Sequence, residues 1–195
     1  MAKTVAIIGV AHHGTTMVAG IYELLGVPMV GARRKERKWE DLEVVAALRD
    51  EERFAAAVAE RDAAHEVWGF KSPGAWLVAP WLGQHLRDPL YLAILKDPVS
   101  VTYRRFGAVT PHKVENTVEQ MRRSVWGLRV SRLPVEWLSY QEAVLAPRRF
   151  VRHLAELAGL RPTAMQVDRA VDWIQPNVTG DRRPYPLVSE HLEAV

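Results

Sequence analysis

The chain has 195 residues, 48% of them hydrophobic and 25% charged, which are proportions typical of a soluble globular protein. Its net charge is only +3, and the absence of cysteine excludes disulfides, thiolate catalysis and cysteine-ligated zinc. The apolar run near the N-terminus is too short for a signal peptide or a membrane span, so we expect one cytoplasmic domain over 1–195.

Short apolar runs alternate along the chain with segments of helical periodicity. The β-branched run at 5–10 is typical of a buried parallel strand, and apolar residues at helical spacing from 18 to 25 predict a helix after it. Further strands are expected at 67–70, 91–95 and 135–138. Further helices are expected at 40–61, from Pro73, from Pro98, and at 114–128, 150–157 and 167–174. The apolar seam of the 114–128 helix is expected to be core.

This alternation predicts an α/β fold, a three-layer sandwich with a central parallel sheet. Ligands of such sheets bind at the carboxyl ends of the strands. Three loops with polar or charged residues follow predicted strands, so we expect the chemistry of the protein to lie there.

The first of these loops is GVAHHGTT, residues 9–16, between the first strand and its helix. Gly9 and Gly14 with the two threonines that follow have the spacing of a Walker A phosphate loop, with Thr15 in place of its lysine. Backbone N–H groups, the helix N-terminus and the hydroxyls of Thr15 and Thr16 could then bind one anion. The alternative is an ordinary glycine turn between a strand and a helix.

The second and third loops each place a lysine just after a strand. Lys71 follows the strand at 67–70, and Lys96 follows the strand at 91–95, with Arg104 and Arg105 on the next helix. Asp97 fits either the magnesium-binding acid of a Walker B strand or the N-cap of that helix, and we prefer the cap because Asp before Pro commonly begins a helix.

These motifs, in this order, resemble the sulfotransferase family that uses 3′-phosphoadenosine 5′-phosphosulfate (PAPS). Members carry a [KR]-S-G-T-[ST] loop, K-x-P after a middle strand, R-[DN]-P before a helix, and a Tyr/Glu turn followed by a helix that ends in a Leu-Gly-Leu-like motif. The corresponding segments here are H-H-G-T-T at 12–16, K-S-P at 71–73, K-D-P at 96–98, WLSYQEAVLAPRRFVRHLAELAGL at 137–160 and WIQPN at 173–177. The resemblance implies a P-loop NTPase-like fold.

The resemblance also implies roles for the first loop. His13, Gly14, Thr15 and Thr16 match the family residues that wrap the 5′-phosphosulfate. His12 takes the place of the family Lys or Arg, which neutralises the bridging oxygen as the sulfuryl group leaves. A histidine is only partly cationic at neutral pH. We therefore expect Lys71 to supply a fixed charge.

For the 3′-phosphate, Lys96 matches the family arginine and keeps its charge without its bidentate fork. The family serine eight residues later falls on Arg104, or on Thr102 if the helix is two residues shorter, and we prefer Arg104 because a guanidinium suits a dianion. The segment 180–183 fits either a loop that closes over this phosphate or a polar turn.

The acceptor needs a general base, for which Glu40, Asp41, His12 and His13 are candidates. Glu40 lies roughly where some relatives place an acidic base, but an ordinary carboxylate at a helix N-terminus fits equally well. No His, Asp or Glu set has metal-ligand spacing, so we expect no metal.

The sequence thus favours a sulfotransferase that transfers a sulfuryl group from PAPS to a hydroxyl or amine. The acceptor is expected to be a small molecule or carbohydrate held by loops 31–39 and 106–113, with no nucleic-acid partner and no indication of an oligomeric state. The alternatives are a P-loop kinase-like phosphotransferase, against which the missing lysine counts, and a non-catalytic nucleotide-binding protein of the same fold.

Overall fold

The computed structural model describes residues 4–29, 44, 47–48 and 50–174. Four parallel strands form one sheet in the order β2-β1-β3-β4. They are β1 (Thr4–Ile7), β2 (Trp68–Lys71), β3 (Pro89–Leu95) and β4 (Val135–Ser139). Each of the four predicted strands is confirmed.

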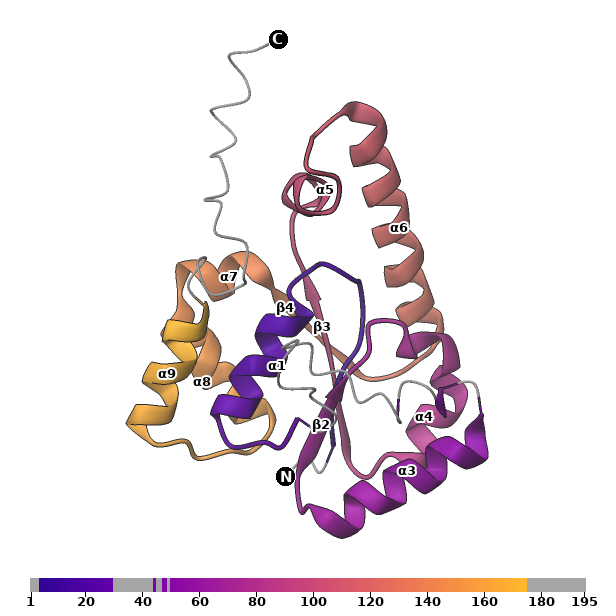
Figure 1. The fold of residues 1–195 in the computed structure, drawn as a ribbon, viewed down its shortest axis with the longest axis vertical. Helices are drawn as coiled ribbons and strands as arrows, with labels where there is room; N and C mark the ends of the chain where they lie inside the picture. The colour runs from indigo at the N-terminus through magenta and orange to yellow at the C-terminus, as the bar shows by residue number, and fades with distance from the viewer. Residues whose placement is uncertain (1–3, 30–43, 45–46, 49, 175–195) are drawn as a thin grey trace.

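Helices follow the strands and cover both faces of the sheet (Figure 1). They are α1 (Thr15–Leu24), α3 (Glu51–Ala64), the 3-10 helix η1 (Ala75–Val78), α4 (Ala79–His85), α5 (Pro98–Phe106), α6 (Pro111–Val130), α7 (Tyr140–Leu145), α8 (Pro147–Leu157) and α9 (Ala164–Ile174). In the described part of the chain, no helix combines the length and the apolarity needed to cross a bilayer.

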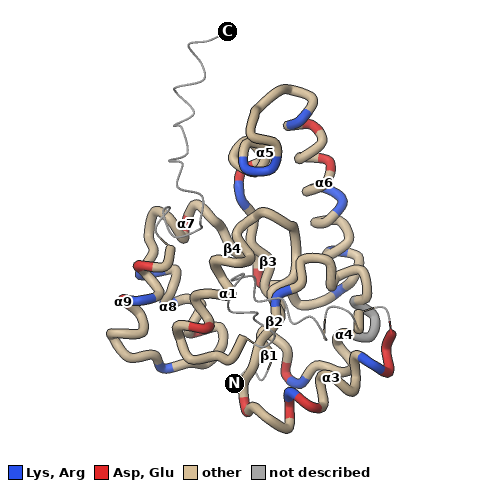
Figure 2. The backbone as a smooth tube through the Cα atoms, viewed as in Figure 1, with Lys and Arg blue, Asp and Glu red and all other residues tan. Residues whose placement is uncertain are grey.

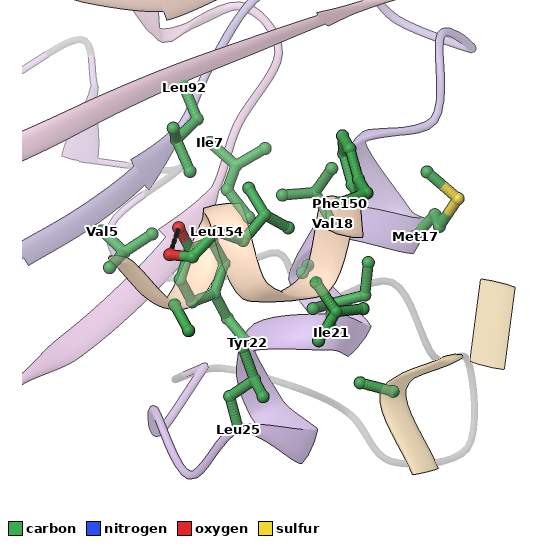
Figure 3. Close-up of a cluster of buried hydrophobic side chains, with 14 of the residues drawn as sticks. Val5, Ile7, Met17, Val18, Ile21, Tyr22, Leu25, Leu92, Phe150 and Leu154 are labelled. Atoms are coloured by element: carbon green, nitrogen blue, oxygen red, sulfur yellow. Dashed lines mark hydrogen bonds between the residues drawn. The ribbon is translucent and has the colours of Figure 1, made fainter. Parts of the chain in front are cut away.

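The alternation of side chains along each strand divides the core into two layers. Val5 and Ile7 of β1 face a cluster contributed by α1, α8 and α9, whereas Ala6 faces a second cluster contributed by α3, α4 and α6. Figure 3 shows the first cluster, in which the buried Tyr22 hydroxyl donates to the Leu154 carbonyl oxygen at 2.9 Å and links α1 to α8. The predicted three-layer sandwich is therefore confirmed.

Two predictions about helix extent are wrong. The helix expected over 40–61 does not run unbroken, because Asp50 is extended with φ −141° and its side chain accepts a hydrogen bond from the Arg53 N–H, so that it caps α3. A capping aspartate favours a new helix start over a helix interior. Pro73 does not begin a helix either, since it precedes η1 at Ala75 and α4 begins only at Ala79.

The seam predicted on α6 is not core over most of its length. Val118 is 44% exposed, and of the predicted seam only Leu128 is buried. The helix instead turns small side chains inward, and at its N-terminal half the Thr117 hydroxyl is hydrogen-bonded to Thr102 of α5 at 2.8 Å. Because α5 and α6 project past the end of the sheet (Figure 1), this half of the helix has no strand to cover it.

Candidate functional site

The loop between β1 and α1 has an unusual backbone. Three of its residues have left-handed φ angles: Gly9 at 120°, His12 at 69° and Gly14 at 109°. A Cβ atom on Gly9 would lie 3.1 Å from the Ala93 Cβ atom, which shows that the loop passes close to β3 as it leaves the sheet. Gly14 is the N-cap of α1, and no side chain of the described residues caps this helix, so the loop brings its first backbone N–H groups to the carboxyl end of the sheet.

Tyr140, the first residue of α7, connects this loop to the ends of two neighbouring strands, β3 and β4. A Cβ atom on Gly14 would lie 2.7 Å from Tyr140 Cδ2, which, with its positive φ, explains why glycine is needed there. The Lys96 ammonium lies 4.4 Å from the centroid of the same ring. Tyr140 thus joins the ends of β1, β3 and β4, a role that our sequence reasoning missed although Tyr140 lies two residues after a predicted strand.

Lys71, the last residue of β2, reaches the first loop from the other side. Its ammonium lies 3.4 Å from Thr16 Oγ1, and the residue is only 4% exposed. The backbone N–H of Ser72 donates to the Ile7 carbonyl oxygen at 2.9 Å, which extends the ladder past the end of β2. The structure therefore brings together Lys71 and Thr16, which are 55 residues apart in the chain.

His13 and Lys96 form the second connection between strand ends. His13 is 1% exposed, and its Nδ1 atom accepts a hydrogen bond of 2.9 Å from the backbone N–H of Lys96. Burial, followed by the charges of His12 and Lys96, lowers the pKa of His13 to about 4. His13 is therefore a neutral imidazole at neutral pH, while the Lys96 ammonium, with its residue 5% exposed, brings a cation to the same place.

His12 lies at the exposed end of the loop among cations. Burial lowers its pKa below 6.5, and the charges of Arg105, Arg104 and Lys71 lower it further. His12 is therefore mostly neutral near pH 7, and the cations beside it come from α5 and β2. Figure 2 shows Lys and Arg positions on α5 and where β3 ends. Sequence reasoning noted Arg105 but gave it no role, because only the fold brings it to the loop.

No family model and no curated protein matches the sequence. Several solved structures are similar to the protein in fold. The sulfotransferase domain of the Synechococcus PCC 7002 olefin synthase is 16% identical with a TM-score of 0.59, over 100% of this chain and 88% of that one. Mouse sulfotransferase SULT7A1 complexed with PAP is 10% identical with a TM-score of 0.58, over 95% and 69%. The chain has the sulfotransferase fold.

A third structure with this fold extends the comparison. Retinol dehydratase in complex with androsterone and the inactive cofactor PAP is 12% identical, with a TM-score of 0.52 over 92% of this chain. This chain spans 66% of that protein, just under two thirds. The sulfotransferase fold implied by the motifs is confirmed, and at these identities the likeness concerns the fold alone.

Within this fold, the structure distinguishes the two interpretations of Asp97. Its Oδ1 atom accepts a hydrogen bond from the Ser100 N–H at 2.7 Å, and its Oδ2 atom accepts one from Gln141 Nε2 at 3.3 Å. The carboxylate thus caps α5 and contacts α7, as the preferred interpretation predicted. Thr102 is fully buried and hydrogen-bonded to the Pro98 carbonyl oxygen, so it faces away from solvent, whereas Arg104 lies exposed in the last turn of α5.

Other expected parts of the site lie outside the described residues. These are Glu40, Asp41, the basic loop 31–39 and the segment 180–183. Among the residues that the structure does describe, no group of three or more His, Asp or Glu side chains could hold a metal ion.

Proposed function

We propose that this protein is a sulfotransferase that moves a sulfuryl group from PAPS to a hydroxyl or amine acceptor. The observation that carries the proposal is the pair of nearly buried lysines, Lys71 and Lys96, on either side of the loop that ends at Gly14. A nearby negative charge stabilises the ammonium group of a nearly buried lysine, and the N-terminus of a helix is a favourable place for an anion. Together they favour a ligand that is rich in negative charge.

The residues present fit the two anionic ends of PAPS. The 5′-phosphosulfate would be held by the loop of His13, Gly14, Thr15 and Thr16, whose N–H and hydroxyl groups are donors. Lys96 and Arg104 would hold the 3′-phosphate. That two structures of this fold are complexes with PAP supports the same choice.

In the proposed reaction, the bond between sulfur and the bridging oxygen breaks, and a new bond forms between sulfur and the acceptor oxygen or nitrogen. Lys71 would stabilise the negative charge left on the departing phosphate. His12 would gain positive charge when the anion binds, because a neighbouring anion raises the pKa of a histidine. The acceptor proton would pass to a base, for which we retain Glu40. The proposal requires no metal, and the acceptor would be a small molecule or a carbohydrate.

Calorimetric titration with PAP tests the proposal. We expect the wild type to bind, and Lys96→Ala to lose roughly tenfold to a hundredfold in affinity, since charged hydrogen bonds are lost. Arg152→Ala is the control, because Arg152 is an exposed cation on α8, outside the segments expected to bind PAP or the acceptor. No binding of PAP by the wild type at millimolar concentration would refute the proposal.

Transfer of labelled sulfate from PAPS to a panel of hydroxyl and amine acceptors tests the chemical step. Lys71→Ala and His12→Ala serve as variants with altered charge at the loop. PAP binding without transfer to any acceptor would favour a non-catalytic nucleotide-binding protein. Magnesium-dependent binding of ATP without binding of PAP would favour a kinase.

A further inference from the structure

We propose that two copies of this protein associate through the outer surface of α6, with the two helices antiparallel. The contact surface, which we call the α6 seam, consists of four residues that the fold leaves exposed or half-buried, Val114, Val118, Met121 and Val125. This inference does not rest on the proposed function, because no residue of the seam is expected to bind PAP.

The α6 seam has the spacing of a contact between helices. Its residues are separated by four, three and four positions, which is the alternation of a and d positions in a heptad repeat. Leu128 continues this pattern, and there the fold buries the side chain in the core cluster formed with α3 and α4. One apolar stripe therefore begins in the core and continues along the half of α6 that projects past the sheet (Figure 1).

Two neighbours of α6 within the chain lie against other sides of the helix. Thr117, which is hydrogen-bonded to Thr102 of α5, lies about 100° around the helix from Val118. Gly127 lies so close to the Trp76 ring of η1 that there is no room for a Cβ atom. Gly127 is about two and a half turns from Val118, so the two residues lie on opposite sides of α6. Val118 therefore points away from η1 and to one side of α5, and it is 44% exposed.

The α6 seam is complementary to itself under two-fold symmetry. In an antiparallel pair, Val118 faces Met121 of the second copy, and Val114 faces Val125 of the second copy. Each residue of the seam then meets an apolar side chain and is removed from water, which is the main driving force of association. Because the same surface serves both copies, association stops at a dimer.

The charges beside the seam favour the antiparallel arrangement. Glu115 and Arg122 are both exposed, and they directly follow Val114 and Met121 at one edge of the seam. An antiparallel pair brings Glu115 of each copy beside Arg122 of the other, whereas a parallel pair in register places neither residue beside an opposite charge. Arg122 also pairs with Glu119 of its own helix, but a guanidinium has enough N–H donors for a second carboxylate.

Sedimentation equilibrium of the full chain tests the proposal. We expect the wild type to dimerise, and Val118→Glu to raise the dissociation constant about a hundredfold, because two-fold symmetry places the change at two contacts that each cost about tenfold. Val130→Glu is the matched control, since it makes the same substitution at a valine of α6 that is 51% exposed and lies outside the seam. A wild type that stays monomeric at near-millimolar concentration would overturn the proposal, as would a dimer that Val118→Glu leaves unchanged.

Charge reversal tests the antiparallel pairing by a second route. Glu115→Arg and Arg122→Glu each bring like charges together, so each variant alone should dimerise roughly tenfold more weakly than the wild type. An equimolar mixture of the two variants should recover the wild-type affinity, because opposite charges then meet in both pairs of the mixed dimer. A mixture that associates no more tightly than either variant alone would overturn the antiparallel pairing of two copies.

Discussion

Acid should destabilise this protein in part through one side chain, His13. Its pKa is about 4 in the folded protein, against an ordinary value of 6.5. Between these two values the unfolded chain binds a proton that the folded chain does not. The contribution of His13 to stability is therefore fully present above pH 6.5 and is lost as the pH falls toward 4.

The size of this loss follows from the difference between the two pKa values. Each unit of difference is equivalent to about 1.4 kcal/mol once the pH lies below both values. Between about pH 7 and about pH 4.5 most of that difference takes effect, so the free energy of unfolding should fall by about 2 kcal/mol through His13 alone. Against a typical total stability of about 5–15 kcal/mol, this change is readily measured.

This loss of stability can be measured by urea denaturation at the two pH values, with tryptophan fluorescence as the signal of unfolding. Carboxylates also titrate in this range, but they do so equally in the wild type and in His13→Asn, which retains the acceptor for the Lys96 N–H without a titratable ring. We expect the loss of stability on acidification to be smaller in His13→Asn by about 2 kcal/mol. Equal losses in the two proteins would show that His13 is not held neutral by the fold.

Three further predictions concern the same loop. Gly14→Ala should lower the free energy of unfolding by about 2 kcal/mol in urea denaturation, because a left-handed residue gains a Cβ atom that must displace Tyr140; an unchanged midpoint would contradict this. PAP affinity measured by calorimetry should rise as the pH falls below 6.5, because His12 then gains charge, and His12→Lys should bind more tightly at high pH with a flatter profile; identical profiles would exclude His12. Lys71→Met should reduce labelled-sulfate transfer about a hundredfold, and an unchanged rate would remove it from the chemical step.

The sheet and its layers could be predicted because each strand is a short, mostly apolar run that alternates with segments of helical periodicity. Local sequence patterns were less informative about helix boundaries and buried faces that depend on tertiary structure. Asp50 ends one helical segment and begins another by capping, which an alanine- and glutamate-rich composition conceals. Periodicity alone also gave the wrong face of α6, because it cannot show that half of this helix projects beyond the sheet. Val118 is exposed there, and the fold buries Thr117 instead.

The proximity of Lys71 and Lys96 to the first loop could be predicted for a different reason. The carboxyl ends of parallel strands share one edge, so lysines placed after two strands must lie near a loop that follows a third. The connections between them could not be predicted. His13 and Lys96 are 83 residues apart, and nothing in either segment indicates a hydrogen bond from a backbone N–H to an imidazole. The approach of Arg105 to His12 likewise depends on how α5 leaves β3.

The missing lysine of the first loop is best understood through the charges that surround that loop. Burial is the main cause of the lowered pKa of both histidines; cations on α5 and β2 lower the pKa of His12 further, and His12 and Lys96 lower that of His13 further. A lysine at position 12 would add a permanent charge to this group and would increase its repulsion in the free protein. We expect a histidine there to stay neutral until the proposed anion binds and then to gain charge. The loop would thus avoid like-charge repulsion in the free state and still offer a cation to the proposed ligand, with a binding affinity that depends on pH.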